Sequence, residues 1–178
     1  MNNLQRLTFA ALATAASLVI VVTGNGAPPA VLEAPSTELP TANEARARAQ
    51  LLHETLHATL QVVHHEYYRE DEALAIPAAT LKKVFHELAT RQKVELRWLA
   101  VNAQPMNADH IARDPFEKLA VAALADGKEA YEQAEDGVYR HAAAITLTSD
   151  CLGCHAPTRT SNKDRTAGLV ITMPIQKQ

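Results

Sequence analysis

The segment Cys151-Leu152-Gly153-Cys154-His155 constrains this chain more strongly than any other part of its sequence. Two thiols three positions apart can each add to one vinyl group of the same porphyrin, and a histidine directly after the second thiol can bind the iron. The segment therefore predicts one covalent c-type haem per chain. Cys151 and Cys154 are the expected attachment points, and His155 is the expected proximal iron ligand.

A closely spaced cysteine pair has three other common uses: a disulfide, half of a zinc site, or a thioredoxin-like redox motif. A zinc site takes four ligands, usually from two such pairs, and this chain has only two cysteines. The redox motif is expected in a βαβ setting near the start of a chain, whereas this pair lies close to the end. The haem interpretation is favoured over all three.

The start of the chain indicates export, which covalent haem attachment requires. Met1–Arg6 carries one positive charge, and Leu7–Val22 is an uninterrupted run of apolar or small residues. This run is shorter than the ~20 residues that cross a bilayer. Residues 1–24 are therefore predicted to be a signal peptide that is removed, which places the protein in the bacterial periplasm. The alternative is an uncleaved inner-membrane anchor that leaves the protein facing the periplasm.

The rest of the chain is expected to form a tether and one domain. Residues 25–42 are rich in proline and lack an apolar period, which is typical of an extended tether. Residues 43–178 suffice for a single haem domain. A net charge of -3 gives no basic footprint for nucleic acid, and a membrane contact is expected only if the first segment stays attached. The sequence does not identify a redox partner protein.

The spacing of apolar residues predicts helices and strands in the proposed haem domain. Three helices, three strands and one loop are expected: helices over Ala42–Arg69, Pro77–Thr90 and Pro115–Ala134, strands over Val94–Val101, Val138–Thr148 and Gly168–Met173, and a loop over Asn102–Asp114. The haem segment lies between the last two strands. The predicted fold class is α+β, with N-terminal helices packed on a small, mainly antiparallel sheet.

The sixth iron ligand matters because it separates electron transfer from gas binding. His64 and His57 border the apolar stripe of the first helix, so His64 is the first candidate and His57 the second. His86 on the second helix, and His110 and Met106 in the predicted loop, are the others. For any one of these histidines, the plainer alternative is that it only packs beside the apolar face.

Haem propionates need cations or hydrogen-bond donors, and several cations flank the haem segment. At least one of these cations is expected to bind a propionate, although each could equally belong to an ordinary charged loop. They are Arg140, Arg159, Lys163 and Arg165.

Several segments resemble a known family, the PAS-like c-type haem domains of bacteria, over roughly Lys93–Pro174. Asn102-Ala103-Gln104-Pro105-Met106-Asn107-Ala108-Asp109 resembles the family's Arg-Asn-Pro-x-Asn-x-Pro-Asp loop, and Phe116-Glu117 resembles the aromatic-Glu pair that follows it. Ile145-Thr146-Leu147 then leads into Cys151–His155 as in the family. The resemblance implies a PAS-like sheet with the haem held against it.

The chain departs from the family pattern at three points. The loop has Asn102 or Ala103 in place of Arg, and Ala108 in place of the second Pro. Some members use an upstream cysteine as sixth ligand, but both cysteines here are taken by attachment. A histidine must replace that cysteine, or the site is open.

Two functions are compatible with these features. The favoured one is a periplasmic monohaem electron carrier whose iron keeps both axial ligands. The alternative is a redox or diatomic-gas sensor module, whose sixth ligand detaches and which acts through a separate partner. Enzymatic turnover such as peroxidase activity is a distant third, because no acid-base group for it is evident.

Overall fold

The protein is described by a computed structural model over residues 38–69 and 72–177. The predicted signal peptide and almost all of the tether lie outside the described residues. Within these two ranges, every helix is too short or too polar to span a bilayer.

An antiparallel four-stranded sheet forms the centre of the domain. Its strand order is β1-β4-β3-β2, from β1 (Glu95–Ala100), β2 (Ala130–Glu135), β3 (Val138–Leu147) and β4 (Arg165–Pro174). The helices are α1 (Ala42–Tyr67), α2 (Pro77–Gln92), α3 (Pro115–Ala125) and α4 (Ser149–His155), with a short 3-10 turn, η2, at Ala108–His110. The predicted α+β class with an antiparallel sheet and N-terminal helices is confirmed.

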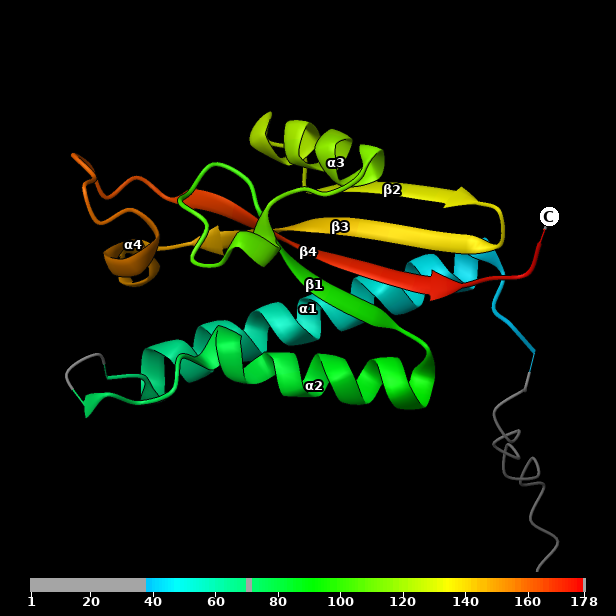
Figure 1. Cartoon of the computed structure of the whole chain (residues 1–178), viewed down its shortest axis with the longest axis horizontal. Helices are drawn as coiled ribbons and strands as arrows, with labels where there is room; N and C mark the ends of the chain where they lie inside the picture. The colour runs from blue at the N-terminus through cyan, green and yellow to red at the C-terminus, as the bar shows by residue number, and fades with distance from the viewer. Residues whose placement is uncertain (1–37, 70–71, 178) are drawn as a thin grey trace, which may run out of the picture. The chain divides into compact units, whose positions relative to one another are not determined.

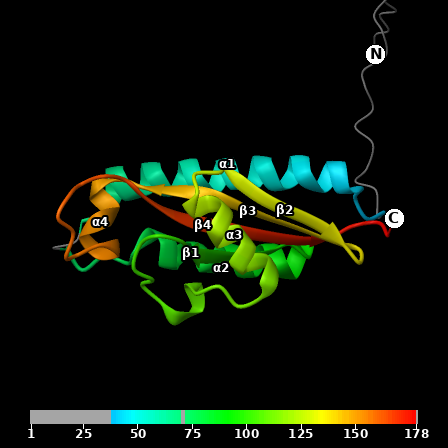
Figure 2. The same ribbon diagram turned by 90° about the horizontal axis from the view of Figure 1, so that it is seen from above.

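The sheet is covered on both faces, which explains why consecutive residues of its central strands are buried. Leu169 and Ile171 of β4 join the core beneath α1 and α2, whereas Val170 joins the core beneath α3. Figure 1 shows α1 and α2 on one side of the sheet and α3 on the other. Figure 2 shows α4 at the end of the sheet that lies away from the C-terminus.

Helix α1 begins where its sequence predicts. The side chain of Thr41 accepts a hydrogen bond from the Glu44 N–H, and the Glu44 carboxylate accepts one from the Thr41 N–H. This capping box satisfies two backbone donors that the first turn leaves free. The apolar stripe continues only in part, because Leu56 is buried but Val63 is exposed.

The predicted helix over Pro115–Ala134 is wrong in its second half. Helix α3 ends at Ala125, and Gly127 follows with a positive φ of 88°. The chain then enters β2, which pairs with β3 from Ala130↔Ala143 to Glu135↔Val138. A glycine in the left-handed region ends a helix readily, so Gly127 is a terminator here and not a weak helical position.

The elements meet at one end of the sheet to frame a site. The C-terminal half of α1, the first turns of α2, the chain after β1 and the end of β3 all reach this end, and α4 lies there as well.

Candidate cofactor site

Helix α4 carries the cysteine pair and the histidine on one side. Thr148 precedes the helix in an extended conformation, and Asp150 lies in the first turn, where a negative charge is favourable. Positions three and four apart share a helix face, so Cys151 lies beside Cys154 and His155. Both thiols are free and half-buried. The alternative of a disulfide is therefore not what the structure contains.

A cavity of about 260 Å³ lies against this side of α4. Its walls are largely apolar and come from segments far apart in the chain. They include Leu60 of α1, Trp98 of β1, and Ile145 and Leu147 at the end of β3. Cys151, Gly153, Cys154 and His155 all line it.

The ring of His155 is oriented by the chain that follows β1. Its Nδ1 lies 3.4 Å from the carbonyl oxygen of Gln104, a long hydrogen bond. A carbonyl oxygen only accepts, so Nδ1 carries the proton and Nε2 keeps its lone pair for a metal. Burial lowers the pKa of His155, the hydrogen bond to Gln104 opposes that shift, and the charge of His64 adds to it. The imidazole is therefore neutral at neutral pH, the form that binds metals.

The loop between β1 and α3 is fastened to the site by backbone bonds. The Gln104 N–H donates to the His155 carbonyl at 2.9 Å. The Asn102 N–H donates to the Thr166 carbonyl at 3.1 Å, and the Asn102 Oδ1 accepts from the Thr166 N–H at 2.7 Å. These bonds carry Met106 and His110 to the cavity wall, which both residues line.

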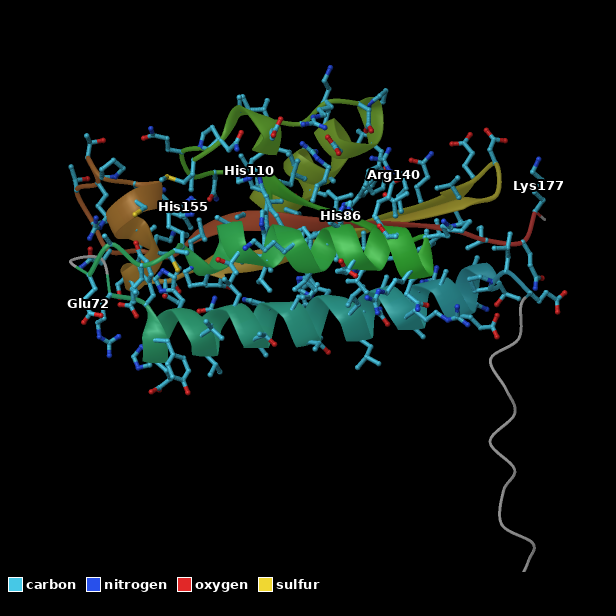
Figure 3. All side chains as sticks on the ribbon, turned by 60° about the horizontal axis from the view of Figure 1, so that its bottom comes forward. Glu72, His86, His110, Arg140, His155 and Lys177 are labelled. Carbon is cyan, nitrogen blue, oxygen red and sulfur yellow. The ribbon has the colours of Figure 1, made fainter. Side chains whose placement is uncertain are left out.

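His110 and His64 are the histidines, besides His155, that the structure brings to this cavity. His110 follows Asn107, which caps η2, and burial is the main reason that the pKa of His110 is lowered, followed by the charges of Lys82 and Arg97. His64 is half-buried on α1, with its ring 5.0 Å from that of Tyr68. Figure 3 shows His110 and His155 at the same end of the domain.

His57 and His86 do not reach the cavity wall. The His57 ring lies 5.6 Å from the buried ring of His53, and its Nε2 is 3.3 Å from the amide nitrogen of Gln61. His86 is exposed on α2 and lies farther along the sheet in Figure 3. The helical spacing placed His57 one step from His64, but α1 crosses the sheet, so the two residues meet different neighbours.

The cations expected near the haem propionates are not among the residues that line the cavity. Arg140 is paired with Asp114 at 2.8 Å and stacks on Phe116 at 4.2 Å, on the α3 side of the sheet. Arg159 donates to the Leu152 carbonyl at 3.0 Å and thereby ties the end of α4 to the chain after it. Arg165 and the exposed Lys163 are also absent from the cavity lining. Proximity in sequence to Cys151–His155 did not bring these cations to the cavity lining.

Lys82 is the cation that the sequence analysis missed. It lines the cavity from α2, together with Ala78 and Ala79. Positions 78, 79 and 82 share one side of a helix, so the signal was a lysine following two small residues at helical spacing. No pattern in the sequence indicates that this side of α2 lines the cavity next to α4.

The residues present suit a flat, largely apolar group bound through sulfur and nitrogen. Two free thiols and an imidazole with an available nitrogen lie on one helix face, apolar side chains form the walls, and Lys82 offers a charge for an acidic edge. The Nε2 of His110 is buried and lacks a hydrogen-bond partner. Over the described ranges, no three His, Cys, Asp or Glu side chains cluster closely enough to hold a bare metal ion.

The fold and the cavity define a small α+β domain with the short helix α4 and its two thiols at one end of an antiparallel sheet. The chain belongs to the Tll0287-like family, whose model matches residues 38–171. The crystal structure of the cyanobacterial haem protein Tll0287 shares this fold, with a TM-score of 0.56 and 18% identity over 76% of this chain and 98% of that one. No curated protein matches the sequence. The expected relationship to a family of haem-binding domains is confirmed.

Proposed function

We propose that this protein is a monohaem c-type cytochrome, exported to the bacterial periplasm, that transfers electrons. Cys151 and Cys154 hold the haem by thioether bonds, and His155 binds the iron from α4. One observation carries the proposal: two free thiols and the His155 ring line one cavity from one helix face. The haem-protein relative supports haem, and the cysteine pair supports covalent attachment.

The chain's own residues do three things for such a group. The Gln104 carbonyl fixes the proton of His155 on Nδ1, which directs Nε2 to the iron. The apolar walls keep water away from the ring and so influence its reduction potential. Gly153 is exposed, and a Cβ there would contact no atom within 4 Å, so the site is open beside α4. When bound, the haem supplies one-electron chemistry, and this opening gives a partner protein access to it.

Attachment is tested by replacing both thiols. Cys151→Ala with Cys154→Ala should yield a colourless protein when it is coexpressed with the haem-attachment machinery, because no thioether can form. The wild type should show a pyridine haemochrome spectrum and an intact mass larger by one haem. Ser161→Ala, an exposed neighbour, is the matched control and should keep the haem. A wild-type chain that carries no added mass contradicts the proposal.

Export is tested on the same preparation. The periplasmic fraction should contain the coloured protein, and its first residue should be Asn25 if the signal peptide is removed after Gly24. Coloured protein found only in the membrane fraction, with Met1 intact, would favour the anchored alternative.

A sensor role is the second candidate, and one observation favours it. His64 lines the cavity from α1, and this 26-residue helix starts at Ala42, next to the predicted tether. Loss of His64 as an iron ligand would therefore shift α1 and so displace the start of the domain. Reduced protein exposed to carbon monoxide separates the two roles: an unchanged Soret band favours the carrier, and a rapid shift favours the sensor.

A further inference from the structure

His110 carries an atom whose environment is unusual. Its Nε2 is buried and has no hydrogen-bond partner, and His110 is among the residues that line the same cavity as His155. Buried polar atoms in native proteins nearly always have a partner, so each exception calls for an explanation. An unpartnered imidazole nitrogen, on a residue that lines an apolar cavity together with two thiols, is suited to coordinate a metal centre placed in that cavity.

The backbone on both sides of His110 is held by one half-buried side chain. Arg97 of β1 donates through Nη2 to the carbonyl of Asp109 and to that of Ile111, the latter at 3.2 Å. Its Nη1 lies 2.5 Å from Oε1 of Glu117, an ion pair without the alignment of a hydrogen bond. We call Arg97 and Glu117 the loop anchor.

The loop anchor is itself secured to α3. Glu117 is only 2% exposed, and its second oxygen accepts from the Arg113 N–H at 2.7 Å. Asn107 adds a local restraint, because its side chain accepts from the Asp109 N–H and its carbonyl accepts from the His110 N–H, both at 2.9 Å. The histidine is thus fixed by a charged network that spans β1, η2 and α3. Such fixation is what a metal ligand requires from its surroundings.

The other two cavity candidates lack these features. His64 lies near the end of α1, its ring is tilted against that of Tyr68, and it has no buried atom without a partner. Met106 is 47% exposed. Neither residue has a side chain bonded to the backbone on both of its sides, as His110 has through Arg97.

We infer that His110 Nε2 is the second axial ligand of the haem, and that the loop anchor is its positioning device. The inference rests on the proposed function. It makes the iron bis-histidine and six-coordinate, with one ligand from α4 and the other from the loop that the Gln104–His155 bonds fasten to α4.

The full-length holoprotein tests the ligand. His110→Ala should keep its covalent haem, as read by intact mass, but lose the low-spin ferric absorption and EPR signals and become high-spin. Added imidazole should restore the low-spin signals. His64→Ala removes the competing cavity histidine and should keep the low-spin signals, and His65→Ala, at an exposed neighbour outside the lining, is the matched control. A His110→Ala protein with unchanged low-spin signals overturns the inference, as does a His64→Ala protein that becomes high-spin.

The loop anchor is tested by Arg97→Lys, which keeps the charge but loses the planar fork that reaches two carbonyls. The expected result is a mixed high-spin and low-spin ferric spectrum. Arg91→Lys, in an exposed pair with Glu87 on α2, is the control and should leave the spectrum unchanged. Should Arg97→Lys fail to fold, Glu117→Gln serves as the second variant. A variant with reduced thermal stability but the wild-type spectrum would make the pair merely structural and overturn this part.

The two levels of the proposal fail differently. Attached haem with a high-spin wild-type spectrum overturns the His110 assignment and leaves the covalent haem standing. A wild-type chain without attached haem overturns both.

Discussion

The charge around the cavity depends on single lining residues. Burial lowers the pKa of His155 and of His110, and Lys82 is the only Lys or Arg among the described residues that line the cavity. A positive charge near a redox centre favours its reduced form, because reduction removes a unit of positive charge there. Lys82 should therefore raise the reduction potential.

Lys82→Gln tests this charge. The reduction potential should fall by some tens of millivolts, with a larger difference at low ionic strength, where screening is weaker. Lys83→Gln is the matched control, since this neighbouring lysine is exposed and does not line the cavity. Spectroelectrochemical titration of both variants gives the comparison. Equal potentials in the two variants would mean that Lys82 does not act on the haem.

At the level of elements, periodicity predicted those whose apolar residues repeat clearly. Both N-terminal helices, β1 and β3 appear close to their predicted bounds because each buries one defined face against a neighbour. β2 was missed because it is an edge strand with polar side chains, Glu132 and Gln133 among them, and little apolar alternation. The available signal was the turn that follows, Asp136-Gly137.

The cysteine pair was predictable for a different reason. Its spacing reflects covalent chemistry, which no tertiary contact can override, and α4 does bring both thiols and His155 together. The rest of the site depends on segments that are far apart in the chain. The spacing of α1 could not show that His64 reaches the cavity while His57 turns to His53, since that depends on how the helix crosses the sheet.

The β2–β3 turn carries its own prediction. Asp136 and Gly137 both have positive φ, 51° and 77°, as a two-residue hairpin turn requires. Gly137→Ala should cost about 1–2 kcal/mol of unfolding free energy, because a side chain is strained in this region. A Cβ there would also lie 3.2 Å from Cγ of Lys177.

Urea denaturation measures this loss, and Gly127→Ala is the comparison. Gly127 also has a positive φ, but a Cβ at that position would contact nothing within 4 Å. Gly127→Ala should therefore lower the unfolding free energy less than Gly137→Ala does. An unfolding midpoint for Gly137→Ala equal to that of the wild type would contradict the strained turn.

The packing of α1 on the sheet involves a polar cluster, with two buried histidines, that lies outside the cavity lining. His53 is 5% exposed, and its Nε2 lies 3.1 Å from the carbonyl oxygen of Ala144, joining α1 to β3. The His141 ring lies 6.5 Å from that of His53, and Tyr139 donates to Glu132 at 2.5 Å. Arg46 of α1 pairs with the same carboxylate at 2.6 Å. Burial of the His141 imidazole, which lowers its pKa, makes the packing of the domain sensitive to acid.

This cluster predicts a loss of stability as the pH falls below about 6.5. Burial lowers the folded-state pKa of His141 and of His57, so the unfolded chain, with ordinary values near ~6.5, binds more protons. Stability is then complete above that pH and declines below it, by up to about 1.4 kcal/mol per pH unit for each group. His141→Gln should flatten the decline, and exposed His65→Gln should not. Urea unfolding of the three holoproteins between pH 7.5 and pH 5 measures the slopes, and identical slopes for wild type and His141→Gln would remove His141 from the cause.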